Sequence, residues 1–175
     1  MKRFVFCIVL LLVSIPISAG ILGISAGATG GVERWKLNIE RAETQTFAAV
    51  GLTATLSPPF IPVGIRGGVE YAWKTVEDVT ISDIFILLGL EYSVAPPLFP
   101  ASFYLGTGLE MATFATSING VREGSSTDFG VLFYGGINFC MGLTAIFVES
   151  GYGIIFAEEL NYSHIPIRGG IKVSL

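Results

Sequence analysis

The chain has 175 residues, of which 51% are hydrophobic and only 14% charged, and its mean hydropathy is +0.68. Average soluble domains carry about 25% charged residues, so this composition indicates one domain that contacts lipid. The formal net charge is −4, and no cluster of lysine or arginine follows the first few residues. A nucleic-acid partner is therefore excluded from the prediction, because such proteins carry basic patches.

The first segment, "MKRFVFCIVLLLVSIPISAG", has a basic start, an apolar run from Phe4 to Ile17 and a small-residue end. This layout predicts a secretory signal peptide over residues 1–20, with cleavage after Ala19 or Gly20. An uncleaved helical anchor is the alternative, but the apolar run is shorter than the ~20 residues that a spanning helix needs. Cleavage leaves Cys140 as the only cysteine, so no internal disulfide is expected.

Residues 21–175 divide into eight apolar segments punctuated by glycine and separated by turn compositions. In chain order, the approximate bounds are 21–31, 46–57, 61–73, 83–95, 101–115, 128–140, 143–156 and 165–175. Many short strands at even spacing are typical of a β-sandwich or β-barrel. Residues 130–148 contain no charge and leave a helical membrane span open as an alternative, and a secreted soluble barrel with an apolar ligand is a third possibility.

The connections between these segments alternate in kind. Those after the second, fourth and sixth segments are tight and include "SPPFIP" and "APPLFPA", whose prolines stop strand pairing. Those after the first, third, fifth and seventh are longer and polar: "GVERWKLNIERAETQ", "KTVEDVTIS", "SINGVREGSST" and "EELNYSH". Short turns at one end and longer loops at the other are the plan of outer-membrane barrels, which have short periplasmic turns and longer extracellular loops.

Charges inside the predicted strands fall on one face only. In "VGIRGGVEYAW", residues 63–73, the odd positions are large and apolar, whereas the even positions are small or charged and include Arg66 and Glu70. The same alternation holds in 84–94, 102–114, 129–140 and 165–175. In a membrane barrel the large apolar face contacts lipid and the small polar face lines a narrow interior. We therefore expect an interior ion-pair network of Arg66, Glu70, Glu91, Glu110, Glu149, Arg168 and Lys172.

Two cross-strand ion pairs are predicted within this set, Arg66 with Glu91 and Glu149 with Arg168. A buried charge costs several kcal/mol unless it is paired, so the seven groups should satisfy one another. An eight-stranded barrel encloses little more than its own side chains, which favours a packed polar plug over a solute path. The excess of four carboxylates over three cations nevertheless leaves cation passage as the alternative. Aromatic residues near the segment ends predict two interfacial girdles: Trp35, Trp73 and Phe129 on the loop side, and Phe60, Tyr92, Phe99, Phe103 and Phe139 on the turn side.

Four features of the sequence point to one family: the signal peptide, the strand count, the loop asymmetry and the alternating last segment "IPIRGGIKVSL". In these features the chain resembles the small eight-stranded outer-membrane barrels of the outer membrane protein X and outer membrane protein A membrane-domain type. The resemblance covers residues 21–175 and implies an all-β, antiparallel up-and-down transmembrane barrel in a bacterial outer membrane. It also implies contact with outer-membrane lipid and lipopolysaccharide, insertion by the barrel assembly machinery, and a monomer. Members commonly end in an aromatic residue, whereas this chain ends in Leu175.

Some similar barrels modify lipid A with an outer-leaflet histidine, a serine and an acidic partner. The only histidine here is His164, next to Ser163, and adjacent strand residues point to opposite faces, so no catalytic residue is assigned. His164 is expected to be a solvated loop residue, as are the second-loop acids Glu77, Asp78 and Asp83. One histidine and one cysteine make no transition-metal site, so neither metal nor cofactor is expected. The sequence thus predicts a structural or surface-interaction barrel, with a small-solute or ion pore as the alternative.

Overall fold

The computed structural model describes residues 23–37, 43–58, 61–96, 99–158 and 161–174, so the predicted signal peptide lies outside the described residues. Eight strands form one closed barrel in sequence order. They are β1 Gly23–Leu37, β2 Gln45–Ser57, β3 Val63–Val76, β4 Val79–Val94, β5 Ala101–Ile118, β6 Val121–Met141, β7 Thr144–Phe156 and β8 Tyr162–Ser174.

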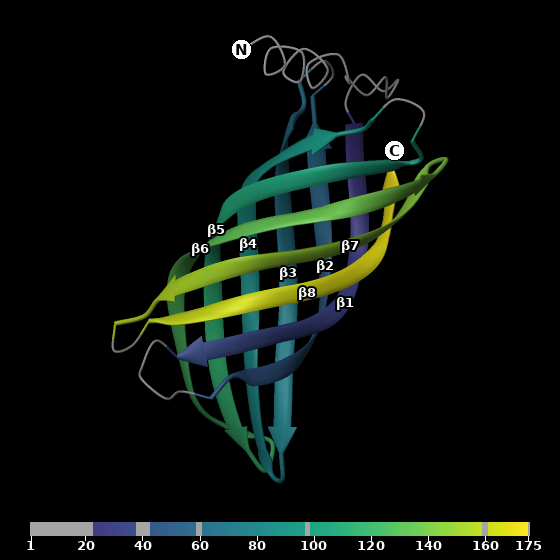
Figure 1. Cartoon of the computed structure of the whole chain (residues 1–175). Helices are drawn as coiled ribbons and strands as arrows, with labels where there is room; N and C mark the ends of the chain where they lie inside the picture. Colours follow the sequence, from purple (N-terminus) through teal and green to yellow (C-terminus); the bar gives the residue numbers. More distant parts are fainter. Residues whose placement is uncertain (1–22, 38–42, 59–60, 97–98, 159–160, 175) are drawn as a thin grey trace.

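Every strand is antiparallel to both of its neighbours, and β8 closes the barrel by pairing with β1 (Figure 1). The predicted eight-stranded antiparallel barrel is therefore confirmed. The alternative of a helix over residues 130–148 is wrong, because these residues belong to β6 and β7 and the chain turns between them. In the described part of the chain, no helix has the length and apolarity needed to cross a bilayer.

The barrel is apolar outside and polar inside, as the alternation predicted. Leu105 and Leu109 on the outer wall are each 69% exposed, whereas Arg66 on the inner wall is fully buried. Two interior tyrosines require glycine on the facing strand. A side chain at Gly106 would collide with the ring of Tyr134, and one at Gly136 would collide with Tyr104. Glycine at these positions is thus explained by the space that interior aromatic rings need.

The prediction of long loops after the third and fifth strands is wrong. The chain reverses instead in two-residue turns at Glu77–Asp78 and Asn119–Gly120, and the flanking strands extend to meet them. Asn119 and Gly120 have φ values of 51° and 79°, the left-handed conformation that a type I′ hairpin turn needs and that an Asn-Gly pair adopts readily. As a result β5 and β6 reach 18 and 21 residues, and the hairpins β3–β4 and β5–β6 project beyond the rest of the barrel (Figure 1).

The two tryptophans lie on opposite sides of the wall. The prediction that Trp35 belongs to an interfacial girdle is wrong: its ring is inside the barrel, 9% exposed, and stacks on Phe47 at 3.9 Å between centroids. This occurs because β1 continues in phase to Leu37, so position 35 falls on the inner face. Trp73 lies on the outer wall and stacks on Tyr71 at 5.4 Å. Phe60, another predicted girdle residue, lies outside the described residues.

This arrangement makes the two tryptophans distinguishable in lipid. In vesicles with brominated acyl chains, we expect strong quenching of the Trp35→Phe variant, which retains only the lipid-facing Trp73. The Trp73→Phe variant, which retains only the enclosed Trp35, should keep most of its emission. Steady-state fluorescence in brominated and unbrominated vesicles measures the difference, and equal quenching of the two variants would contradict the position of Trp35.

Candidate functional site

The seven charged residues predicted for the interior are all buried, with exposed fractions between 0% and 6%. They come from five strands: Arg66 and Glu70 from β3, Glu91 from β4, Glu110 from β5, Glu149 from β7, and Arg168 and Lys172 from β8. Each lies on the inner face because its strand alternates in phase from end to end. The fold thus gathers charges that are far apart in the sequence into one narrow space.

Arg66 bridges two carboxylates on different sides of the barrel. Its Nη1 donates to Glu91 Oε2 at 3.2 Å, on the neighbouring strand β4. Both of its terminal nitrogens also donate to Glu149 on β7, Nη2 to Oε1 at 3.2 Å and Nη1 to Oε2. The Tyr104 hydroxyl donates to Glu149 Oε2 at 2.9 Å, and the Tyr134 ring lies 4.6 Å from the guanidinium carbon of Arg66. A two-nitrogen contact with one carboxylate is the stronger geometry for arginine.

Arg168 lies among three carboxylates. It contacts Glu149 Oε1 at 3.4 Å through Nη1 and Glu33 Oε1 at 3.0 Å through Nη2. Its Nε is 2.6 Å from Glu70 Oε2, although the N–H direction does not satisfy hydrogen-bond geometry. The contacts of Arg66 with Glu91 and of Arg168 with Glu149 are the two pairs named from the sequence. Glu33, assigned to the first loop, is instead fully buried on β1.

His164 is not the solvated loop residue that the sequence suggested. β8 begins at Tyr162, three residues earlier than predicted, so His164 lies on the inner face in phase with Arg168 and is fully buried. Its Nδ1 is 2.9 Å from Glu33 Oε2 and its Nε2 is 2.8 Å from Glu110 Oε2. The ring stacks on Phe85 at 4.8 Å and occupies the space that Gly153 leaves open on β7. Extending the alternation of β8 backwards from Arg168 would have found this residue.

The end of the interior nearest the long hairpins is filled by an aromatic layer, which we define as Trp35, Phe47, Phe85, Phe114 and Tyr162. The prediction of a solvated Asp83 is wrong, because this residue lies fully buried on β4 beside that layer. Tyr162 donates to Asp83 Oδ2 at 3.0 Å. The interior therefore has charged groups in its middle and aromatic rings between these groups and the hairpin end of the barrel.

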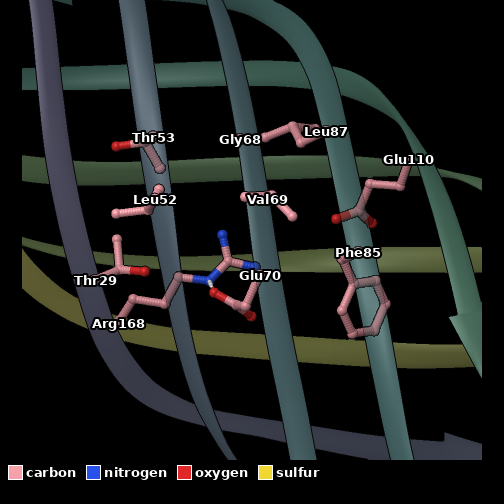
Figure 2. Close-up of a pocket in the computed structure, with 10 residues that line it drawn as sticks. All are labelled: Thr29, Leu52, Thr53, Gly68, Val69, Glu70, Phe85, Leu87, Glu110 and Arg168. Carbon is pink, nitrogen blue, oxygen red and sulfur yellow. Dashed lines mark ion pairs between the residues drawn. The ribbon is translucent and has the colours of Figure 1, made fainter.

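A small cavity remains among the charged groups (Figure 2). Its volume is about 10 Å³, which is room for about one water molecule. Glu70 and Arg168 lie at one side of it and Glu110 at another (Figure 2). In the described ranges, no group of three or more His, Cys, Asp or Glu side chains has an arrangement that would hold a metal ion.

Lys172 differs from the two interior arginines. Its Nζ lies over two aromatic rings, 4.4 Å from the centroid of Tyr104 and 4.7 Å from that of Phe147. Within the part of the chain that the structure describes, no carboxylate lies at ion-pair distance from it. Its ammonium group therefore makes cation–π contact with these two rings in place of a direct ion pair.

No family model and no curated protein matches this chain. Among solved structures it is similar to Neisserial surface protein A, with 12% identity, a TM-score of 0.73, and coverage of 89% of this chain and 98% of that one. It is similar to Ail, the attachment invasion locus protein of Yersinia pestis, in complex with a heparin analogue, with 12% identity, a TM-score of 0.58 and coverage of 87% and 99%. The outer membrane enzyme PagL gives 13% identity, a TM-score of 0.51 and coverage of 87% and 99%. At these identities the likeness shows the fold alone.

Proposed function

We propose that this chain, which has the fold of the small eight-stranded outer-membrane β-barrels, is a closed scaffold that presents its projecting hairpins at the cell surface. Its apolar outer wall contacts outer-membrane lipid, and its rim contacts lipopolysaccharide. We further propose that residues 1–20 are the export signal, that the barrel assembly machinery inserts residues 21–175, and that the inserted barrel is a monomer.

One observation carries the closed state. A continuous chain of contacts runs through the interior in the order Glu91, Arg66, Glu149, Arg168, Glu33, His164 and Glu110. It crosses the barrel twice, from β3 to β7 and from β8 to β5. The aromatic layer covers this chain on the hairpin side. Side chains that contact one another and are covered by the aromatic layer leave little room for a solute, which supports a plug.

A cation pore is the second candidate, and the charge balance favours it. Among the described residues the interior holds six buried carboxyl groups, now including Glu33 and Asp83, against three buried cations and one histidine. An acidic lining of this kind is what selects cations in channels. The two functions differ in whether a continuous wet path exists.

Planar-bilayer recording separates these functions. We expect no discrete conductance steps from the wild-type chain, because the interior contacts leave no open path. A pore would show steps and cation selectivity, and the selectivity would fall in the Glu70→Gln variant, which removes an interior charge. Glu123→Gln, which removes an exposed hairpin carboxylate, is the matched control. Reproducible wild-type steps that Glu70→Gln alters and Glu123→Gln does not would refute the closed scaffold.

We also propose that the barrel is not an enzyme, although PagL shows that this fold also hosts an enzyme. His164 is enclosed in the interior and engaged by two carboxylates, so it does not face lipid. Ser163 points the other way, and its hydroxyl donates to the Lys36 carbonyl at 3.4 Å. Hydrolysis of a lipid ester by this pair would need the hydroxyl and the imidazole on the same face.

A further inference from the structure

The small cavity in the barrel interior has polar groups on several sides (Figure 2). Glu70 on β3 and Glu110 on β5 line it, together with Thr29 on β1, whose hydroxyl points toward the side chain of Arg168 (Figure 2). The volume of about 10 Å³ is room for one particle of the size of a water molecule. The charges and oxygen atoms of these groups decide which particle fits there.

Glu70 directs only one of its two carboxylate oxygens at Arg168. Its Oε2 is 2.6 Å from Arg168 Nε, whereas its Oε1 is buried and has no hydrogen-bond partner among the described residues. The residue is only 6% exposed, so solvent outside the barrel does not solvate this oxygen. Burying a carboxylate oxygen without a partner is costly. Because Glu70 lines the cavity, this oxygen indicates a ligand there.

The charges around the cavity do not balance. Glu33, Glu70 and Glu110 are three buried carboxylates, and the cations in contact with them are Arg168 and His164. Even with a doubly protonated His164, three negative charges meet two positive ones. The contact of Arg168 with a further carboxylate on β7 weakens its compensation of these three. One negative charge is therefore left over, and a buried charge needs a partner of opposite sign.

The size and the ligands of the cavity fit a small monovalent cation. Within the described part of the chain, no three His, Cys, Asp or Glu side chains are arranged to hold a metal ion. Ca²⁺ and Mg²⁺ take about six or more oxygen ligands, so two carboxylates and a hydroxyl do not suit them. The surplus of one charge also matches a single positive charge. Sodium fits a space for one water molecule better than the larger potassium ion.

A proton on Glu70 would remove the same surplus charge. It would not occupy the cavity, however, and it would give neither Glu110 nor Thr29 a new partner. A sodium ion neutralises the charge, contacts the Glu70 oxygen that has no hydrogen bond, and lies among the oxygen atoms of the other two residues. One particle thus accounts for the charge, for the buried oxygen and for the cavity.

We propose that the cavity between Glu70, Glu110 and Thr29 binds one sodium ion as a structural cation of the closed barrel. The ion neutralises the surplus negative charge beside Arg168. Because the surrounding side chains enclose it, it is taken up as the barrel folds and exchanges slowly afterwards. This inference goes beyond the surface role of the hairpins and concerns the interior plug.

Urea titration of the full chain in zwitterionic vesicles tests the site, with choline chloride replacing sodium chloride at constant ionic strength. An ion that binds only the folded barrel stabilises it by mass action. Above the dissociation constant, each tenfold rise in sodium should lower the unfolding equilibrium constant about tenfold. Potassium chloride should have a smaller effect. Chain folded in radioactive sodium chloride and passed through a desalting column should retain about one sodium ion per molecule.

Two variants act on the cavity in different ways. Glu70→Gln removes the surplus charge and should abolish both the sodium dependence and the retained sodium. Gly68→Ala changes no charge but places a methyl group at the cavity, where its nearest neighbour is the Leu52 carbonyl oxygen at 3.4 Å, an ordinary contact. It should fold and lose the sodium dependence. The matched control Glu91→Gln removes an interior carboxylate that does not line the cavity, and it should keep the sodium dependence.

Three results would overturn the proposal: equal stability in sodium and choline, equal effects of sodium and potassium, or a sodium dependence that Glu70→Gln and Gly68→Ala retain. Equal stability in the two salts with an unchanged Glu70→Gln variant would assign a proton to Glu70 instead. Bilayer recording keeps this inference apart from the proposed function. A silent barrel that is insensitive to sodium refutes only the cation site, whereas a conducting barrel that sodium stabilises refutes only the closed scaffold.

Discussion

The Arg66→Ala variant is expected to lose about 3–5 kcal/mol of unfolding free energy, measured by urea titration of the chain folded in lipid vesicles. Arg66 is fully buried and hydrogen-bonds to both Glu91 and Glu149. Removing it leaves Glu91 buried without a cation and Glu149 with only its 3.4 Å contact to Arg168, and the uncompensated burial of these carboxylates accounts for most of the expected loss. The loss of packing against the Tyr134 ring adds to it.

Arg122→Ala is the control for this experiment, because it removes an exposed arginine from the projecting part of β6. It should change the unfolding free energy by less than about 0.5 kcal/mol. The double variant Arg66→Met, Glu149→Gln should recover part of the loss, because it removes one of the stranded charges together with the cation. Comparable losses for Arg66→Ala and Arg122→Ala would contradict a stabilising role for the interior pairs.

The His164→Ala variant is expected to lose a similar amount, about 3–5 kcal/mol, in the same titration. A doubly protonated imidazole donates to Glu33 and Glu110 at once, and alanine leaves these two carboxylates facing each other. The substitution also opens a cavity where the ring stacked on Phe85. Together these effects make His164 one of the two positions with the largest expected cost in the barrel.

A double-mutant cycle isolates the charged part of this effect. Among the described residues the Glu110 side chain contacts only His164 through hydrogen bonds, so the His164→Ala and Glu110→Gln pair should show a coupling of about 1–3 kcal/mol. A cycle of His164→Ala with Glu123→Gln, on the exposed hairpin, should show none. Absence of coupling in the first cycle would mean that the loss in His164→Ala comes from the cavity alone.

The alternation of apolar and small or polar residues was sufficient to predict the strand count and which side chains face lipid. Leu88, Leu90 and Tyr92 were assigned to the lipid-facing side from alternation alone, and all three are exposed on the outer wall. The errors lie at strand ends. Trp35 and His164 are mispredicted because the first strand is predicted to end too early and the eighth to begin too late. Asp83 is mispredicted because it is assigned to the loop although it begins the predicted fourth segment. Each of the three residues lies in phase with its strand. The Asn-Gly pair at 119–120 was an available signal for the tight turn between β5 and β6.

No pattern of neighbouring residues could predict the contacts across the interior. Arg66 and Glu91 lie on adjacent strands, so their proximity follows from the hairpin register, whereas the second partner of Arg66, Glu149, lies 83 positions away across the barrel. Which side chains meet across the interior depends on how far the strands are staggered when the sheet closes, and that stagger is a property of the whole barrel. The sequence by itself determined the strands and their two faces, because side-chain alternation is a property of neighbouring residues. Only the tertiary structure decided that His164 lies between Glu33 and Glu110 and that Val121 lies opposite Ile118, because barrel closure sets the first and a one-residue bulge sets the second.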